Sequence, residues 1–264
     1  GTYNDYYTNI TDNESAVLSG GVTTQYRSGN HNLSFGFSAN MNENVNYVKN
    51  LGKETTAGKG EWQFTLAPDL DYSYSKDSFS TNVYYFGSTQ QPSNSQMSPT
   101  LNLGNPTMIS AGNIYLKQYM YHYLGGYVRH NNRENFSYVN ARFSGNMEQN
   151  AIVQASWFDR NAIRYSVPVN SRKPSYSLSG TLTYNQPFGE KRYWTFSTYA
   201  DVSYSASAGY QAKEGLEGMD IEEFDYNDFM SVFWGNSSGD RFYSGDSGFS
   251  ESKMTTLHYA LDLG

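Results

Sequence analysis

The fold is decided by the segment LSFGFSANMN, which runs from Leu33 to Asn42. Large or apolar residues occupy its odd positions, and polar or small residues occupy its even positions. Successive side chains of a β-strand point to opposite faces of a sheet, so the segment predicts a strand with one apolar and one polar face. A helix would repeat its apolar residues every three to four positions, and that period is almost absent from the chain.

The same alternation recurs from one end of the chain to the other. It is clear at residues 62–73, 176–184, 194–204 and 256–263, although Pro68 removes one hydrogen-bond donor from the first of these runs. We predict about nine strands, at residues 16–26, 32–48, 61–75, 78–87, 118–130, 135–157, 162–184, 192–206 and 253–263.

The lengths of the connections predict how these strands are arranged. Short turns at residues 27–31, 76–77, 131–134 and 185–191 alternate with longer links at 49–60, 88–117 and 205–252. The link at residues 159–161 is the one exception. Short turns at one end and long loops at the other are typical of an antiparallel up-and-down outer-membrane β-barrel.

A soluble β-sandwich or β-solenoid also alternates, and it is the main alternative. Sandwich strands usually have about five or six residues, whereas several runs in this chain exceed about twelve. Tyr, Phe and Trp make up 17% of the residues, and rings at strand ends suit the two membrane interfaces. The length of the strands and the position of the rings together favour the barrel.

Charge and composition exclude several other classes of protein. The chain has 25 acidic and 18 basic residues, a net charge of −7, which disfavours nucleic-acid binding. It has no cysteine, so neither a disulfide nor a thiolate metal site is available.

One long link carries a family resemblance. It contains Gln90-Gln91-Pro92-Ser93, Gln96-Met97-Ser98-Pro99, Gly104-Asn105-Pro106 and Gly112-Asn113-Ile114-Tyr115-Leu116-Lys117, in that order between two strands. This order resembles a segment in the barrel of Bacteroidetes TonB-dependent outer-membrane receptors, specifically the family related to SusC-type transporters. Further matches run to about residue 205. Two departures are visible, because Ile114 stands where the family has Pro and Gln118-Tyr119 stand where it has Pro-Glu.

The resemblance implies a function, a location and partners. It implies energised uptake of a large polar nutrient, glycan or peptide-like, across the outer membrane of a Gram-negative bacterium. It implies an inner-membrane TonB complex that acts through a plug domain, and a possible surface lipoprotein. Residues 1–264 are then expected to be a partial transmembrane barrel, an incomplete segment without the plug and the remaining strands. A soluble surface adhesin or glycan-binding β-sandwich is the alternative function.

Ligand contact is predicted in the longest link, residues 205–252, where acidic and aromatic residues interleave. The residues selected as substrate-binding are Asp220, Glu222, Asp225, Tyr226, Phe229 and Trp234. Carboxylates and rings together supply hydrogen-bond acceptors and stacking faces for a polar ligand. Calcium ligation is an alternative, but the spacing of an EF-hand is absent.

No catalytic residue, cofactor or metal site is expected in the chain. The four histidines, His31, His122, His130 and His258, are scattered and lack the spacing of a zinc motif. Asp69 and Asp71 share the polar face of one strand, whereas a glycosidase needs two carboxyl groups that converge across a cleft. Both are expected to be water-facing residues of the barrel interior.

Overall fold

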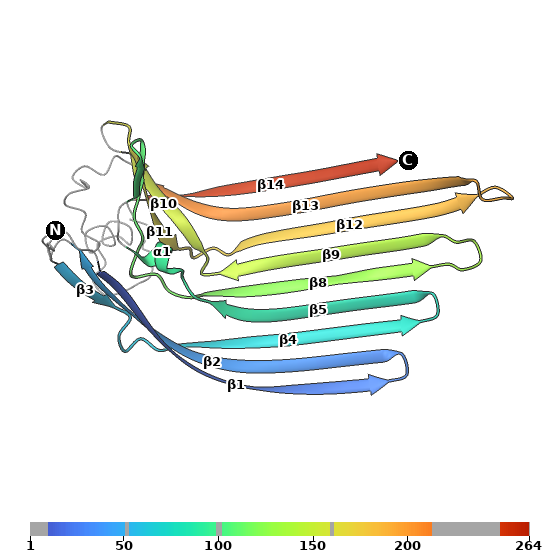
Figure 1. The fold of residues 1–264 in the computed structure, drawn as a ribbon, viewed down its shortest axis with the longest axis horizontal. Helices are drawn as coiled ribbons and strands as arrows, with labels where there is room; N and C mark the ends of the chain where they lie inside the picture. The colour runs from blue at the N-terminus through green and yellow to red at the C-terminus, as the bar shows by residue number, and fades with distance from the viewer. Residues whose placement is uncertain (1–9, 51–52, 99–101, 159–160, 213–248, 264) are drawn as a thin grey trace, which may run out of the picture.

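The structure is a computed structural model that describes residues 10–50, 53–98, 102–158, 161–212 and 249–263 (Figure 1). Within these ranges a single sheet contains fourteen strands. The elements are β1 (Ile10–Ser28), β2 (His31–Asn50), β3 (Lys53–Ala57), β4 (Gln63–Lys76), β5 (Phe79–Gln90), α1 (Asn94–Met97), β6 (Asn102–Asn105), β7 (Met108–Ser110), β8 (Tyr119–Asn131), β9 (Tyr138–Gln149), β10 (Ile152–Phe158), β11 (Arg164–Asn170), β12 (Ser175–Phe188), β13 (Trp194–Ala212) and β14 (Phe249–Leu263).

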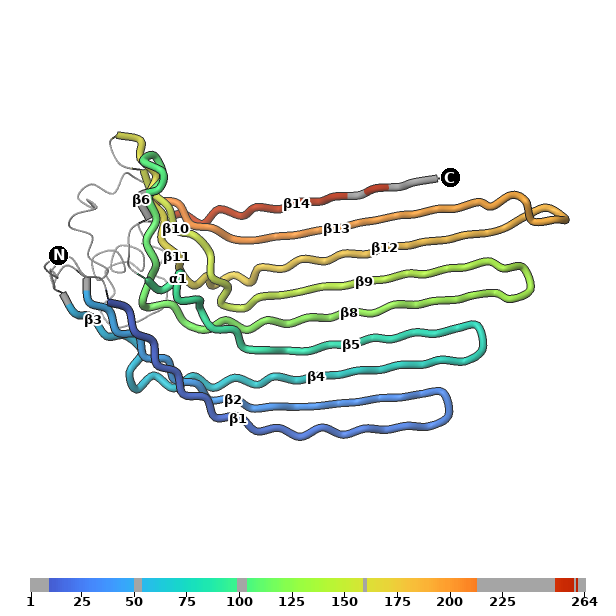
Figure 2. The backbone as a smooth tube through the Cα atoms, viewed as in Figure 1, coloured from blue at the N-terminus to red at the C-terminus, as the bar shows by residue number. Residues whose placement is uncertain are grey.

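The long strands form one antiparallel meander, in the order β1-β2-β4-β5-β8-β9-β12-β13-β14. Their register is continuous; Phe37 of β2, for example, lies opposite Val22 of β1 and Pro68 of β4. The short turns gather at one end of the sheet and the long links at the other (Figures 1 and 2). We call these the turn end and the loop end. The predicted all-β, up-and-down architecture of an incomplete barrel is confirmed.

The two faces of the meander differ in what covers them. The even-numbered face of β2, with Asn42 and Asn46, contacts a folded segment of the loop end, and we call it the inner face. The opposite, outer face carries Phe35, Phe37 and, on β4, Phe64, which are 51%, 42% and 60% exposed. No second sheet covers these rings in the described part of the chain. The sandwich alternative is therefore wrong for this fold, because a sandwich would bury them.

An apolar band continues along the outer face of the other strands. Its exposed members include Leu18, Val22, Leu124, Val128, Phe143, Leu178, Leu182, Val202 and Leu257. Exposed rings also lie on this face close to the turns, namely Tyr26, Phe79, Phe188 and Trp194. Apolar side chains in mid-strand and aromatic ones near the strand ends match the profile of a lipid-facing surface.

Two predicted strands are each divided in the structure. Residues 135–157 contain β9 and β10, which are separated at Asn150, a residue in the left-handed region with a φ of 61°. Residues 162–184 contain β11 and most of β12, and Pro174 lies between them, where it offers no backbone donor. Because β9 pairs directly with β12, residues 150–174 form another long link at the loop end. The alternation of short turns and long links then has no exception.

The excursion between β9 and β12 builds a small extension of the sheet. β10 and β11 form an antiparallel hairpin, and β10 runs parallel to the end of β13, with Ala155 opposite Tyr210. β11 pairs in parallel with β7, and β7 pairs with β6. The predicted link at residues 88–117 thus contains two short strands and α1.

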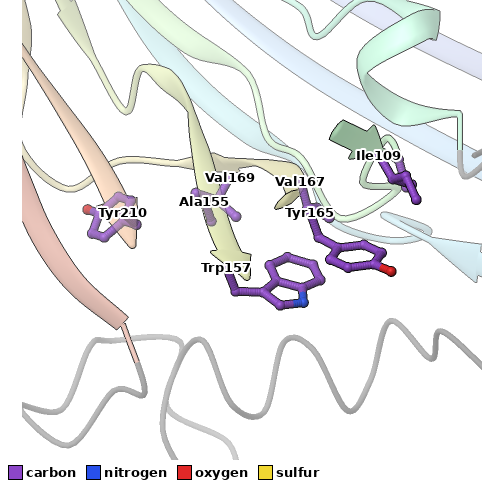
Figure 3. Close-up of a cluster of buried hydrophobic side chains, with 8 residues drawn as sticks. Ile109, Ala155, Trp157, Tyr165, Val167, Val169 and Tyr210 are labelled. Carbon is purple, nitrogen blue, oxygen red and sulfur yellow. The ribbon is translucent and has the colours of Figure 1, made fainter. Parts of the chain in front are cut away.

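The larger of two buried apolar clusters among the described residues lies in this extension, where it meets the end of β13. It consists of Ile109, Ala111, Ala155, Trp157, Tyr165, Val167, Val169 and Tyr210 (Figure 3). The rings of Trp157 and Tyr165 stack with centroids 5.6 Å apart and an angle of 15° between their planes. Among the described residues, no helix has the length and apolar character needed to span a bilayer.

Candidate functional site

The residues predicted to bind substrate lie outside the part of the chain that the structure describes. Asp220, Glu222, Asp225, Tyr226, Phe229 and Trp234 all belong to residues 213–248. Their role stays a prediction. The site that the structure does describe lies on the inner face and at the loop end.

Its first component is a buried segment, residues 111–118, which we call the strap. The strap holds the last part of the family-like motif, residues 112–117, and Asn113, Ile114 and Leu116 are buried. Ile114 packs against Val48 of β2 and Ala57 of β3. Position 114, where the resembling motif has Pro, is therefore occupied by an apolar side chain that packs in a small buried cluster.

Asparagine and glutamine side chains fix the strap at both of its ends. On β2, the side-chain amide of Asn46 donates to the carbonyl of Ile114 at 3.0 Å, and that of Asn42 donates to Oε1 of Gln118 at 2.7 Å. At the other side, the amide of Asn113 donates to the carbonyl of Pro168 in β11 at 2.9 Å. Asn150, at the end of β9, donates to the carbonyl of Gln118 at 2.8 Å.

These contacts make the strap a bridge across the sheet. β2 and β9 are separated in the sheet by β4, β5 and β8. The strap joins β2 to the loop-end limit of β9 and to β11. The paired side-chain N–H groups of Asn42 and Asn46 favour one geometry, because a buried donor that loses its acceptor costs desolvation energy.

The helix α1 holds the beginning of the strap. Ser93 and Gln96 form a capping box at its start, as expected for a helix that is only one turn long. The backbone amides of Gly112 and Asn113 donate to the carbonyls of Ser98 and Gln96, at 2.8 and 2.7 Å. A Cβ at Gly112 would overlap those carbonyls, so this close approach requires glycine.

The second component is a group of rings on the inner face, which we call the ring cluster: Tyr84 and Phe86 of β5, with Tyr121 and Tyr123 of β8. The ring centroids of Phe86 and Tyr123 are 5.3 Å apart, with 20° between the planes. Those of Tyr84 and Tyr123 are 5.6 Å apart, and those of Phe86 and Tyr121 are 6.1 Å apart.

Carboxylates frame the ring cluster on both sides. In the register of the sheet, Asp69 lies opposite Phe86, Asp71 lies opposite Tyr84, and Glu148 lies opposite Tyr121. The Cβ atoms of directly opposed residues on one face lie about 5 Å apart. The Asp69 carboxylate leans away from Phe86, over Gly36 of β2. The inner-face position predicted for Asp69 and Asp71 is confirmed, but their neighbours are rings and not water alone.

The sequence did not single out the ring cluster. Tyr84, Phe86, Tyr121 and Tyr123 are two pairs on different strands, about 36 residues apart along the chain. Only the pairing of β5 with β8 brings them together. A large ring on the otherwise polar face of a strand is a usable signal. To see which of these rings come together, one needs the register in which β5 pairs with β8.

The four histidines lie on three strands: His31 on β2, His122 and His130 on β8, and His258 on β14. His31 contacts the hydroxyl of Tyr72 at 2.9 Å, and His122 contacts that of Tyr85 at 2.8 Å. His258 lies 3.4 Å from Asp201. Within the described ranges, no three His, Asp or Glu side chains are grouped in a way that could hold a metal ion.

Comparisons with known proteins give a likeness to solved structures. No family model matches the chain, and no curated protein sequence matches it. The crystal structure of the siderophore receptor PirA from Pseudomonas aeruginosa matches with a TM-score of 0.36 and 15% identity. The match covers 75% of this chain and 43% of that chain, so this chain spans less than half the length of the receptor. At that score and identity the likeness establishes neither family nor function.

Proposed function

We propose that this chain forms part of the barrel of an outer-membrane receptor that takes up a large polar nutrient. The observation that carries the proposal is the difference between the two faces of one meander. The outer face exposes a continuous apolar band, and the inner face is polar and holds the strap. A sheet with an apolar outside and a polar, partly filled inside is the arrangement of a membrane barrel.

The orientation of the barrel in the membrane follows from the lengths of its connections. Outer-membrane barrels have short turns on the periplasmic side and long loops on the outside. We therefore assign the loop end, with the strap and the β10–β11 hairpin, to the cell surface. The residues proposed to bind substrate, Asp220, Glu222, Asp225, Tyr226, Phe229 and Trp234, belong to a link at that end.

The finer assignment rests on the motif that forms the strap. Its resemblance to SusC-type receptors of Bacteroidetes supports uptake that is driven by an inner-membrane TonB complex acting through a plug domain. It also supports a surface lipoprotein as a possible partner. In this proposal the barrel binds and passes its substrate, glycan or peptide-like, and performs no covalent chemistry.

Single-cysteine labelling tests the membrane assignment, and the chain suits it because it contains no cysteine. Cysteines would be placed on the outer face at Phe37 and Leu182 and on the inner face at Ser38 and Ser179. Each variant, assembled in outer-membrane vesicles, would carry a fluorophore that brominated lipid quenches. We expect strong quenching at the two outer positions and little at the two inner ones. Equal quenching on both faces would contradict the proposal.

Replacement of residues 214–234 by a short Gly/Ser link tests the ligand-binding role. The measurements are nutrient uptake by cells that carry the receptor and the heat resistance of the barrel on gels. Lost uptake with normal heat resistance is expected. Unchanged uptake by an intact barrel would contradict a role of this link in binding.

A further inference from the structure

We propose that the ring cluster on the inner face binds a cationic group of the ligand, an ammonium or a guanidinium. The inference rests on the proposed function, because it takes the inner face to be the water-filled side that a ligand passes. It goes further by naming a place on the barrel wall and the chemistry that the place selects.

The rings form a patch that is available to a ligand. They stack on one another with planes inclined by 20° and 23° in two of the pairs, so they present a continuous surface. Phe86 is 39% exposed. A Cβ at Gly125 would lie 2.9 Å from Cζ of Tyr84, which shows that the tip of this ring lies directly over the glycine. The ring of Tyr84 therefore lies along the sheet.

The charge around the rings selects a cation. Asp69 and Asp71 stand on one side of the cluster and Glu148 on the other. The face of an aromatic ring is itself electronegative and attracts ammonium and guanidinium groups. The rings and the carboxylates both attract cations, and both repel anions. A neutral polyol would not require three acidic neighbours.

Two carboxylates elsewhere in the described structure have basic partners. Asp201 on β13 faces His258 at 3.4 Å, and Glu61 faces Lys117 at 3.0 Å. By contrast, none of the carboxylates beside the rings forms an ion pair with a described residue. Asp71 accepts only from the side-chain amide of Asn82, at 3.3 Å. Within the described residues, the negative charge beside the rings therefore has no basic partner.

The inner face also makes room for this charge. Gly36 of β2 lies opposite Asp69, and a Cβ at Gly36 would overlap the Asp69 carboxylate. The Asp69 carboxylate thus lies over the backbone of β2, on the side of β4 away from Phe86, and leaves that ring uncovered.

Binding of a tetra-arginine amide peptide to the full chain in neutral detergent micelles tests the proposal. Phe86→Leu removes a ring without changing the charge, and we expect it to weaken binding about three- to tenfold. Asp71→Asn should weaken binding to a similar extent at low salt. The matched controls are Tyr199→Leu, a ring elsewhere on the inner face, and Asp201→Asn, a carboxylate elsewhere on it. Both should bind nearly as the parent chain does.

The other outcomes separate a specific site from attraction by net charge. Phe86→Tyr keeps a ring and should retain binding, which guards against a loss of folding in Phe86→Leu. If Phe86→Leu folds and binds as the parent does, or if the controls lose as much as Asp71→Asn, the proposal is wrong. Preferential binding of the neutral sugar maltotetraose at the rings would also overturn it. Because the labelling experiment reports the membrane assignment separately, a failure of cation binding can be distinguished from a failure of the proposed function.

Discussion

Asn113 shows how one buried amide fixes the position of the strap. Its side-chain nitrogen donates to the carbonyl of Pro168, and its side-chain oxygen accepts from the backbone amide of Tyr115 at 2.9 Å. Both bonds are formed by a residue that is only 1% exposed. Losing them leaves two buried backbone groups without these partners.

We expect Asn113→Ala to lower the free energy of unfolding by about 1 to 3 kcal/mol, the usual cost of leaving buried polar groups unpaired. Urea unfolding of the chain in micelles would measure it. The control is Asn40→Ala, because Asn40 lies on the inner face of β2 and its side chain makes no hydrogen bond to a described residue. Equal losses in the two variants would contradict the role of Asn113.

Phe37 and Ser38 are neighbours in sequence that face opposite sides of β2. Phe37→Lys places a charge on the apolar band and should destabilise the protein in a bilayer by about 2 to 4 kcal/mol if the position lies near the midplane. Ser38→Lys places the same charge on the polar inner face and should cost much less. Refolding titrations into lipid vesicles give both values. A larger cost for Ser38→Lys would mean that the faces are assigned the wrong way round.

At the scale of elements, the β10–β11 hairpin depends on its buried ring pair. Trp157 is 2% exposed, and truncating a buried Trp to Ala typically costs about 3 to 5 kcal/mol. We expect Trp157→Ala to abolish the hydrogen-exchange protection of β10 and β11 while β4 and β5 stay protected. Phe158→Ala is the control, because Phe158 is the next residue and is 46% exposed. Loss of protection throughout the sheet would show that the hairpin is not a separate unit.

The long strands could be predicted because their two faces meet different environments. In residues 33–41 of β2 and 176–184 of β12 every second residue is apolar, aromatic or glycine, and a shift of one residue would turn the whole set to the wrong face. The division at Asn150 could not be predicted in this way. The alternation continues across it, and the left-handed backbone that ends β9 is a conformation that Asn permits without demanding it.

The candidate site was harder to predict than the strands, for a physical reason. The strap motif was recognised as a loop, but its bonds to Asn42, Asn46 and Asn150 are formed by residues that are distant in sequence. The ring cluster similarly depends on the register between β5 and β8. A sequence pattern indicates which face of a strand a side chain occupies. To predict a site, one must also know which residues of other strands and loops lie next to that side chain.

For the whole molecule, the outer band and the two sheet edges predict its behaviour in solution. β1 and β14 do not pair with each other within the described residues, so their outer backbone groups have no strand partner there. Such edges, together with an exposed apolar face, promote association in water. We expect the 264-residue chain to aggregate without detergent and to become monodisperse in micelles. A soluble monomer in water that unfolds cooperatively, as seen by sedimentation and circular dichroism, would contradict the membrane assignment.

The strap has a mechanical consequence for the sheet that it crosses. Strands β4, β5 and β8 lie between the two strands that the strap joins. The bonds of the strap to Asn42 and Asn46 of β2 and to Asn150 at the end of β9 restrain the distance between these two strands at the loop end. A change in the curvature of this part of the sheet would have to break those bonds.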